Sequence, residues 1–309
     1  MDPRITLAGA LVGFIVGLTG MGGGALLTPI LVLFLGIDPL TAVSSDLVAA
    51  MVMKPVGGAV HMRRGTVNYR LVGWLMLGSI PAAFGAVIVL TRVADPASTS
   101  NIIKTAIGVA LLLASFALVA KSVLGARRPS DSAPLAAGDV KPLATLAVGV
   151  FGGTVVGLTS VGSGSLMIVL LLLIYPRLSG KQLVGTDLVQ AVPLVASAAI
   201  AHLIFGDVKL SITGSLLLGS LPAVYLGAKI SSRAPDNLIR PVLAVVLVAS
   251  GLKLLKVPNE AVAITLLVLA VALFTVLRFG GKAREALTGT PVEADPLADP
   301  LAEPESQAS

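Results

Sequence analysis

The chain has 309 residues, of which 55% are hydrophobic and only 12% are charged. Soluble domains carry about 25% charged residues, so this chain lacks the polar surface that a water-soluble globule needs. Its mean hydropathy of +0.96 predicts that most of it lies in lipid. The sequence contains no cysteine, which excludes disulfides and thiolate metal sites, and its formal net charge of +6 comes from basic residues in short loops, where they report orientation.

Apolar stretches follow one another along the chain, and a spanning helix needs about 20 such residues. Stretches with the length of a single crossing lie at 41–62, 69–90, 102–124, 182–204, 210–230, 238–256 and 261–279. Two others, 5–36 and 143–175, are too long for one crossing, and a glycine-rich segment interrupts each of them. We expect each to form a broken helix or helical hairpin whose tip lies inside the protein. The first is not read as a signal peptide, because a similar segment recurs at 144–158.

The two halves of the chain repeat one another. Residues 17–26 read GLTGMGGGAL and residues 157–166 read GLTSVGSGSL, while ten of the 22 positions in 61–82 are identical in 202–223. Chance would give one or two. Each half adds three crossings to its broken segment, and this odd number predicts inverted repeats of the kind found in many carriers.

The fold expected is therefore an all-α polytopic membrane protein with two homologous, inverted repeats. Its parts are a first transmembrane repeat at 1–124, a linker at 125–141, a second repeat at 142–256, an extra transmembrane helix at 257–279 and a disordered acidic tail at 280–309. Basic residues follow 41–62, occupy the linker and begin the tail, which predicts that the linker and the C-terminus are cytoplasmic. They are Arg63, Arg64, Arg70, Arg127, Arg128, Lys282 and Arg284.

The two glycine-rich breaks are the first candidates for a substrate site. Unwound backbone inside a membrane leaves N–H and C=O groups without partners, at a cost of several kcal/mol each, unless it lines a cavity or binds something. A helix that restarts there directs its positive end at the cavity, which favours an anion. The alternative is close packing of helices through small residues. The candidate substrate contacts are Thr19, Gly20, Met21, Gly22, Gly23, Gly24, Thr159, Ser160, Gly162, Ser163 and Gly164.

Lys54 lies near the middle of 41–62, where an ammonium costs at least about 2.5–3.5 kcal/mol. We expect it to face the protein interior beside an anionic group and to contact the substrate. The alternatives are a structural ion pair with an aspartate and a different depth of the helix in the membrane. The second half has Val195 at the matching position, so the charge is asymmetric.

Five further residues are candidates for coupling or gating. Asp46 and Asp187 occupy matching positions near the first turns of their helices, where a carboxylate caps the helix or binds H⁺ or Na⁺. Gln190 lies one turn after Asp187. His61 and His202 end their helices near the expected membrane boundary, either as interfacial residues or as a proton-linked gate.

Together these features resemble the TauE/SafE family, also called the sulfite exporter or toluene-sulfonate uptake permease family. The resemblance covers 5–256 and rests on GLTGMGGGALLTPIL (17–31), GLTSVGSGSLMIVLL (157–171), the Ser/Thr-Asp helix starts and the histidine-containing helix ends. It implies a bacterial cytoplasmic-membrane permease, without cofactor or metal, for sulfur-containing anions such as sulfite, a sulfonate or sulfoacetate. We expect alternating access and proton-driven export.

Two other classes of function stay open. An intramembrane enzyme would use His61, His202, Asp46 and Asp187, although the chain has no HExxH motif and no cysteine nucleophile. A membrane scaffold without a substrate predicts that Lys54→Ala leaves function intact.

Overall fold

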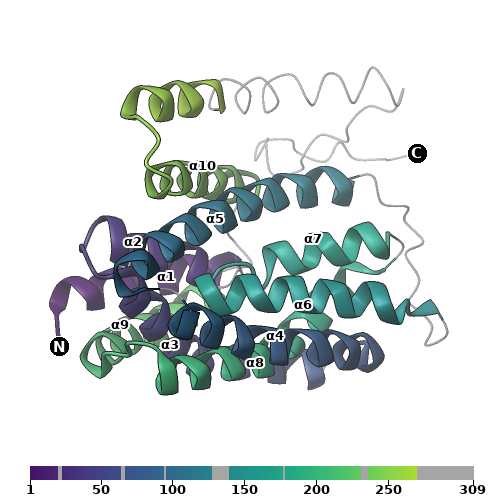
Figure 1. Ribbon diagram of the computed structural model, residues 1–309. Helices are drawn as coiled ribbons and strands as arrows, with labels where there is room; N and C mark the ends of the chain where they lie inside the picture. The colour runs from purple at the N-terminus through teal and green to yellow at the C-terminus, as the bar shows by residue number, and fades with distance from the viewer. Residues whose placement is uncertain are drawn as a thin grey trace, which may run out of the picture. The chain divides into compact units, whose positions relative to one another are not determined.

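In a computed structural model, the described residues are 1–19, 23–63, 67–93, 95–126, 139–176, 178–230 and 236–269. The regular elements among them are all helices, as the sequence predicts (Figure 1). The first half contains α1 (Pro3–Thr19), α2 (Gly24–Leu33), α3 (Pro39–Arg63), α4 (Tyr69–Val93) and α5 (Pro96–Ala126). The second half contains α6 (Pro142–Thr159), α7 (Ser165–Ile174), α8 (Gly180–Phe205), α9 (Leu210–Ile230) and α10 (Asp236–Leu254).

Five of the described helices are long and apolar enough to cross a membrane, namely those covering Tyr69–Arg92, Ser98–Ala120, Pro142–Thr159, Gln182–Phe205 and Leu210–Gly227. Helix α3 has the same length as α4 but is more polar, because it carries a Ser-Ser-Asp run and Lys54. Large apolar side chains on the outside of the helices, such as Phe116 at 70% exposure, suit a lipid environment. The chain is therefore a multi-pass membrane protein.

Both long apolar stretches are broken into two helices at the predicted glycine-rich segments. In the second half, Ser160, Gly162 and Gly164 have φ angles of 59°, 108° and 124°. This left-handed backbone ends α6 and lets the chain turn back into α7, which lies beside α6 (Figure 1). In the first half, α1 and α2 are also in contact, and the intervening residues 20–22 lie outside the described part.

The helices of one half pack against those of the other in a reciprocal pattern. Helix α1 packs against α9 and α4 packs against α6, while α3 pairs with α8 and α5 with α10. Equivalent glycines make the first two contacts: Gly13 faces Ser220, and Gly153 faces Ser79. A Cβ atom on Gly153 would lie 2.4 Å from the backbone oxygen of Ser79, so only glycine allows this approach. The sequence duplication is therefore matched by a duplicated packing of helices.

Several predicted boundaries shift in the structure. Helix α5 continues to Ala126, so the predicted linker at 125–141 begins within a helix, and residues 127–138 lie outside the described part. A short apolar helix at Asn259–Leu269 covers the start of the predicted extra crossing. The rest of that segment and the acidic tail at 280–309 also lie outside the described residues.

Candidate functional site

The two broken segments meet inside the protein. Gly24 begins α2, and a Cβ atom placed on it would lie 2.0 Å from the backbone oxygen of Ser160, the residue that ends α6. Glycine at this position therefore allows the start of one broken segment to touch the tip of the other. Gly24 and Ser160 are 136 residues apart in the sequence (160 − 24), and this contact brings them into one site.

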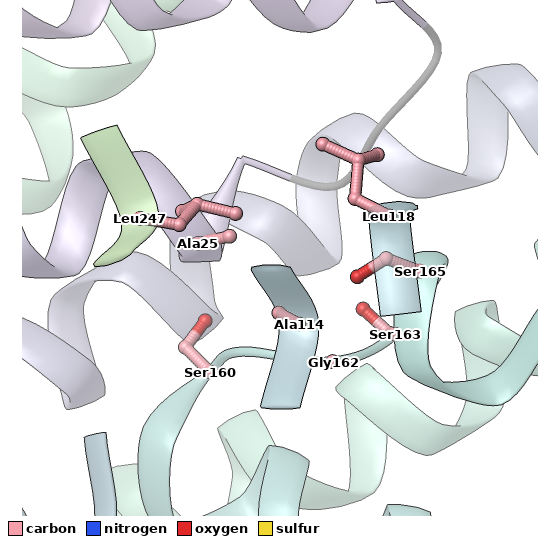
Figure 2. Close-up of a pocket in the computed structure, with 8 residues that line it drawn as sticks. All are labelled: Ala25, Ala114, Leu118, Ser160, Gly162, Ser163, Ser165 and Leu247. Carbon is pink, nitrogen blue, oxygen red and sulfur yellow. The ribbon is translucent and has the colours of Figure 1, made fainter. Parts of the chain in front are cut away.

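A small cavity lies at this meeting point (Figure 2). Its volume is about 20 Å³, which is enough for one water molecule. The hydroxyls of Ser160, Ser163 and Ser165 surround it together with apolar groups (Figure 2). The remaining lining residues are Ala25, Ala114, Leu118, Gly162 and Leu247. An anion of several heavy atoms needs more space, so these residues must separate before one can bind.

Asp46 links α3 to both broken segments. Its carboxylate has no exposure to solvent, accepts a hydrogen bond from the Thr28 hydroxyl at 3.0 Å, and accepts a second from the Ser160 side chain. Because α3 begins at Pro39, Asp46 lies two turns inside the helix, and its interpretation as a first-turn cap is wrong. The same correction applies to Asp187, since α8 begins at Gly180.

Lys54 reaches the tip of the second broken segment. Its half-buried ammonium donates a hydrogen bond to the Ser163 hydroxyl at 2.5 Å. The same ammonium interacts electrostatically with Asp187 and with Asp46. One cation on α3 thus interacts with two carboxylates and with a hydroxyl that lines the cavity.

Gln190 and Asp187 form the side of this cluster contributed by α8. Gln190 is fully buried, and its amide group donates a hydrogen bond to the Ser79 hydroxyl of α4 at 2.7 Å. Asp187 is 2% exposed and interacts with Lys54. The structure therefore places Gln190 one turn beyond the carboxylate, where it joins α8 to α4.

His202 is fully buried rather than exposed at a membrane surface, so its interpretation as an interfacial residue is wrong. Its Nε2 lies 2.8 Å from the carbonyl oxygen of Gly157, and its Nδ1 lies 2.7 Å from the Ser44 hydroxyl. Because a carbonyl only accepts, Nε2 carries the hydrogen, and in a neutral ring Nδ1 accepts from Ser44. His202 thus joins α8 to α3 and to the last turn of α6. His61 belongs to α3, but its side chain lies outside the described part.

The remaining predicted residues shape the broken segments. The Thr159 hydroxyl donates to the carbonyl of Val155 and accepts from the N–H of Val161, so it stabilises the turn, and it does not line the small cavity. The Thr19 hydroxyl donates to the Ile15 carbonyl at the end of α1. Gly23 and Gly164 occupy the N-cap positions of α2 and α7. Gly20, Met21 and Gly22 lie outside the described residues.

The hydroxyl that precedes each buried aspartate has a role that was not predicted from the sequence. Thr186 accepts the N–H of Asn68, which lies directly before α4, at 3.0 Å. Ser45 accepts the N–H of Lys209, which lies directly before α9, at 3.4 Å. Asn68 and Lys209 are related by the same offset of 141 residues as Ser45 and Thr186, so the repeat itself contained the signal. Each hydroxyl satisfies a backbone donor at the start of a helix that packs against it.

Within the described ranges, no group of three or more His, Cys, Asp or Glu side chains is placed to hold a metal ion. The site combines three hydroxyls that line a small cavity with a cation and two buried carboxylates that interact with one another through Lys54.

Comparison with known proteins shows the family to which the chain belongs. Residues 5–254 match the family described as Sulfite exporter TauE/SafE. The "Probable membrane transporter protein YjnA" of Bacillus subtilis (strain 168) is 39% identical over 256 residues, which cover 82% of this chain and 100% of the relative. The "Probable membrane transporter protein YdhB" of the same organism is 26% identical over 256 residues, covering 81% and 99%. No solved structure matches the chain. Since the match extends over nearly all of the helical part, the chain belongs to the TauE/SafE family of membrane transporters.

Proposed function

We propose that this transporter is a permease for small sulfur-containing anions, such as sulfite, a sulfonate or sulfoacetate, in the bacterial cytoplasmic membrane. The observation that carries the proposal is the hydrogen bond between Lys54 and Ser163, which puts a cation beside the cavity at the tip of the broken segment. An ammonium within the membrane part of a protein is costly and marks a pathway for a charged substrate.

The chemistry around Lys54 suits an oxyanion. Ser160, Ser163 and Ser165 supply hydroxyl donors, and α7 begins at Ser165 with its positive end at the same place. A sulfite or sulfonate group presents three oxygens on one side, each able to accept a hydrogen bond from an ammonium or a hydroxyl. Charge-assisted bonds of this kind are about twice as strong as neutral ones.

Alternating access is the transport mechanism that the packing supports. The site lies where α3 of the first half and the α6–α7 tip of the second half meet, so a movement of one half against the other opens it. We propose that the halves are inverted repeats, because an odd number of crossings in each half makes their orientations opposite. A cytoplasmic C-terminus and linker complete this arrangement.

The enzyme alternative has weaker support, because His202, one of its candidate residues, is already engaged. Both ring nitrogens of His202 are hydrogen-bonded. A general base needs a free position facing a substrate.

The test is anion exchange by the purified full chain in proteoliposomes. Vesicles loaded with one anion are diluted into the same radiolabelled anion, using sulfite, methanesulfonate and acetate in separate experiments. We expect exchange of sulfite and methanesulfonate above that of protein-free vesicles, and slower exchange of acetate. Exchange of acetate alone would contradict the substrate class, and exchange of none would contradict the permease itself.

A further inference from the structure

Three charged side chains act on one another at the site. Lys54 interacts electrostatically with Asp46 and with Asp187. Helices α2, α6 and α7 add none, because they contain no charged residue, and the charged residue of α1, Arg4, lies in its first turn, at the opposite end from the break. Two carboxylates and one ammonium give this cluster one net negative charge.

The other described charged residues, including Arg70 on α4, Lys104 on α5 and Lys229 on α9, are not among the charged groups that act on Asp46 or Lys54. His202 on α8 is fully buried and its ring nitrogens contact only the Ser44 hydroxyl and the Gly157 carbonyl, so no carboxylate partner favours the charged ring. Arg92 near the end of α4 lies over the ring of Phe205, 5.5 Å from its centre, and Lys253 on α10 donates to Asn259. The side chains of His61 and Arg63 on α3 lie outside the described part.

Adding an anion to a cluster that is already negative is unfavourable. A monovalent anion beside Lys54 would raise the net charge to two negative units in a buried environment, where like charges repel strongly. The anion would also compete with Asp46 and Asp187 for the single ammonium. Binding therefore requires that one carboxylate lose its charge.

Asp46 is suited to take up a proton. Its hydrogen-bond partners Thr28 and Ser160 are hydroxyls, which can accept as well as donate hydrogen bonds. A protonated Asp46 therefore stays hydrogen-bonded without new ligands, whereas a metal cation would need several oxygen ligands in its place. Ser160 also lines the cavity, so a proton on Asp46 is adjacent to the substrate space.

We propose that the substrate anion and a proton bind this site together, with Asp46 as the proton acceptor and Lys54 as the anion contact. This inference rests on the proposed function. One proton for each monovalent anion leaves the net charge of the cluster unchanged. The transporter is then a proton–anion symporter, and an inward proton gradient drives uptake, the opposite of the proton-driven export expected from the sequence.

The experiment measures the ratio of protons to anions moved. Sodium-free proteoliposomes of the full chain contain a pH-sensitive dye, and potassium with valinomycin holds the membrane potential at zero. Radiolabelled methanesulfonate is added outside, because it stays ionised and carries no proton itself. We expect acidification of the lumen with a ratio near one in the wild type. Asp46→Asn should lower that ratio several-fold, whatever its rate of anion movement.

Asp38→Asn is the matched control, because Asp38 is an exposed carboxylate directly before the same helix and caps it through the N–H of Leu40. Its ratio should equal that of the wild type. Methanesulfonate exchange without acidification in the wild type would overturn symport while leaving the permease intact. An absolute requirement for sodium would overturn the proton as the coupled ion. An unchanged ratio in Asp46→Asn would overturn the assignment to Asp46, and no exchange of any anion would overturn the proposed function as well.

Discussion

Replacing His202 by leucine tests the contacts that hold the α6–α7 tip in place. The substitution keeps an apolar body of similar size but removes both ring nitrogens. The carbonyl of Gly157 and the hydroxyl of Ser44 then lose their partners at 2.8 and 2.7 Å. Both groups lie inside the protein, away from water.

The expected loss of stability follows from these two contacts. A buried polar group left without its partner costs about 1–3 kcal/mol, so two such groups cost about 2–6 kcal/mol together. The lower end applies if the Ser44 hydroxyl turns to a carbonyl of its own helix, as serines in helices do. The Gly157 carbonyl has no alternative N–H partner in α6, because it belongs to the last turn of that helix.

The measurement is the free energy of unfolding in mixed micelles, followed by the fluorescence of Trp74, the single tryptophan of the chain. Leu203→Ala is the matched control, because Leu203 is the next residue on α8 and is 49% exposed. The control should change the unfolding free energy by less than about 1 kcal/mol, since it removes an exposed side chain. Equal stability of His202→Leu and the wild type would refute the two hydrogen bonds.

Two further substitutions test the contacts between the halves. Gly153→Ala places a Cβ atom 2.4 Å from the Ser79 oxygen and should destabilise the protein by about 1–3 kcal/mol. The control Gly85→Ala on α4 meets nothing within 4 Å and should be neutral or stabilising. Equal effects of the two substitutions on the free energy of unfolding would contradict the close α4–α6 contact. Thr186→Val removes the acceptor of the Asn68 N–H and should lower the free energy of unfolding by about 1–3 kcal/mol. The control Thr154→Val removes a hydroxyl that bonds within α6 and should lower it less. The reverse order would contradict the capping role of Thr186.

Much of the fold could be predicted because lipid imposes strong rules on sequence. The apolar stretches predicted the helices within a few residues, and the glycine-rich segments predicted both breaks. The packing partners could not be predicted in the same way. Helix α6 lies against α4 because Gly153 faces the backbone of Ser79. A single sequence does not show which glycine will face which backbone.

The site was predicted in part, and the errors have a common cause. The sequence pointed to Lys54 and to the tip containing Ser163, which the structure brings within hydrogen-bonding distance. It misplaced Asp46 because the helix starts at Pro39, earlier than hydropathy alone suggests. It placed His202 at the membrane surface because a histidine near the end of an apolar stretch gives no sign of the serine and carbonyl that surround it.

The most direct test of the anion site is the affinity of the purified protein for methanesulfonate, measured by calorimetry in wild type and Lys54→Met. Methionine keeps the length of the side chain and removes the charge. A hydrogen bond to a charged group contributes about 1.5–3 kcal/mol, which corresponds to a roughly 10- to 150-fold increase in Kd. Lys253→Met, which removes an exposed ammonium from α10, should leave Kd unchanged. A Kd for Lys54→Met equal to that of the wild type would contradict the placement of the substrate beside Lys54.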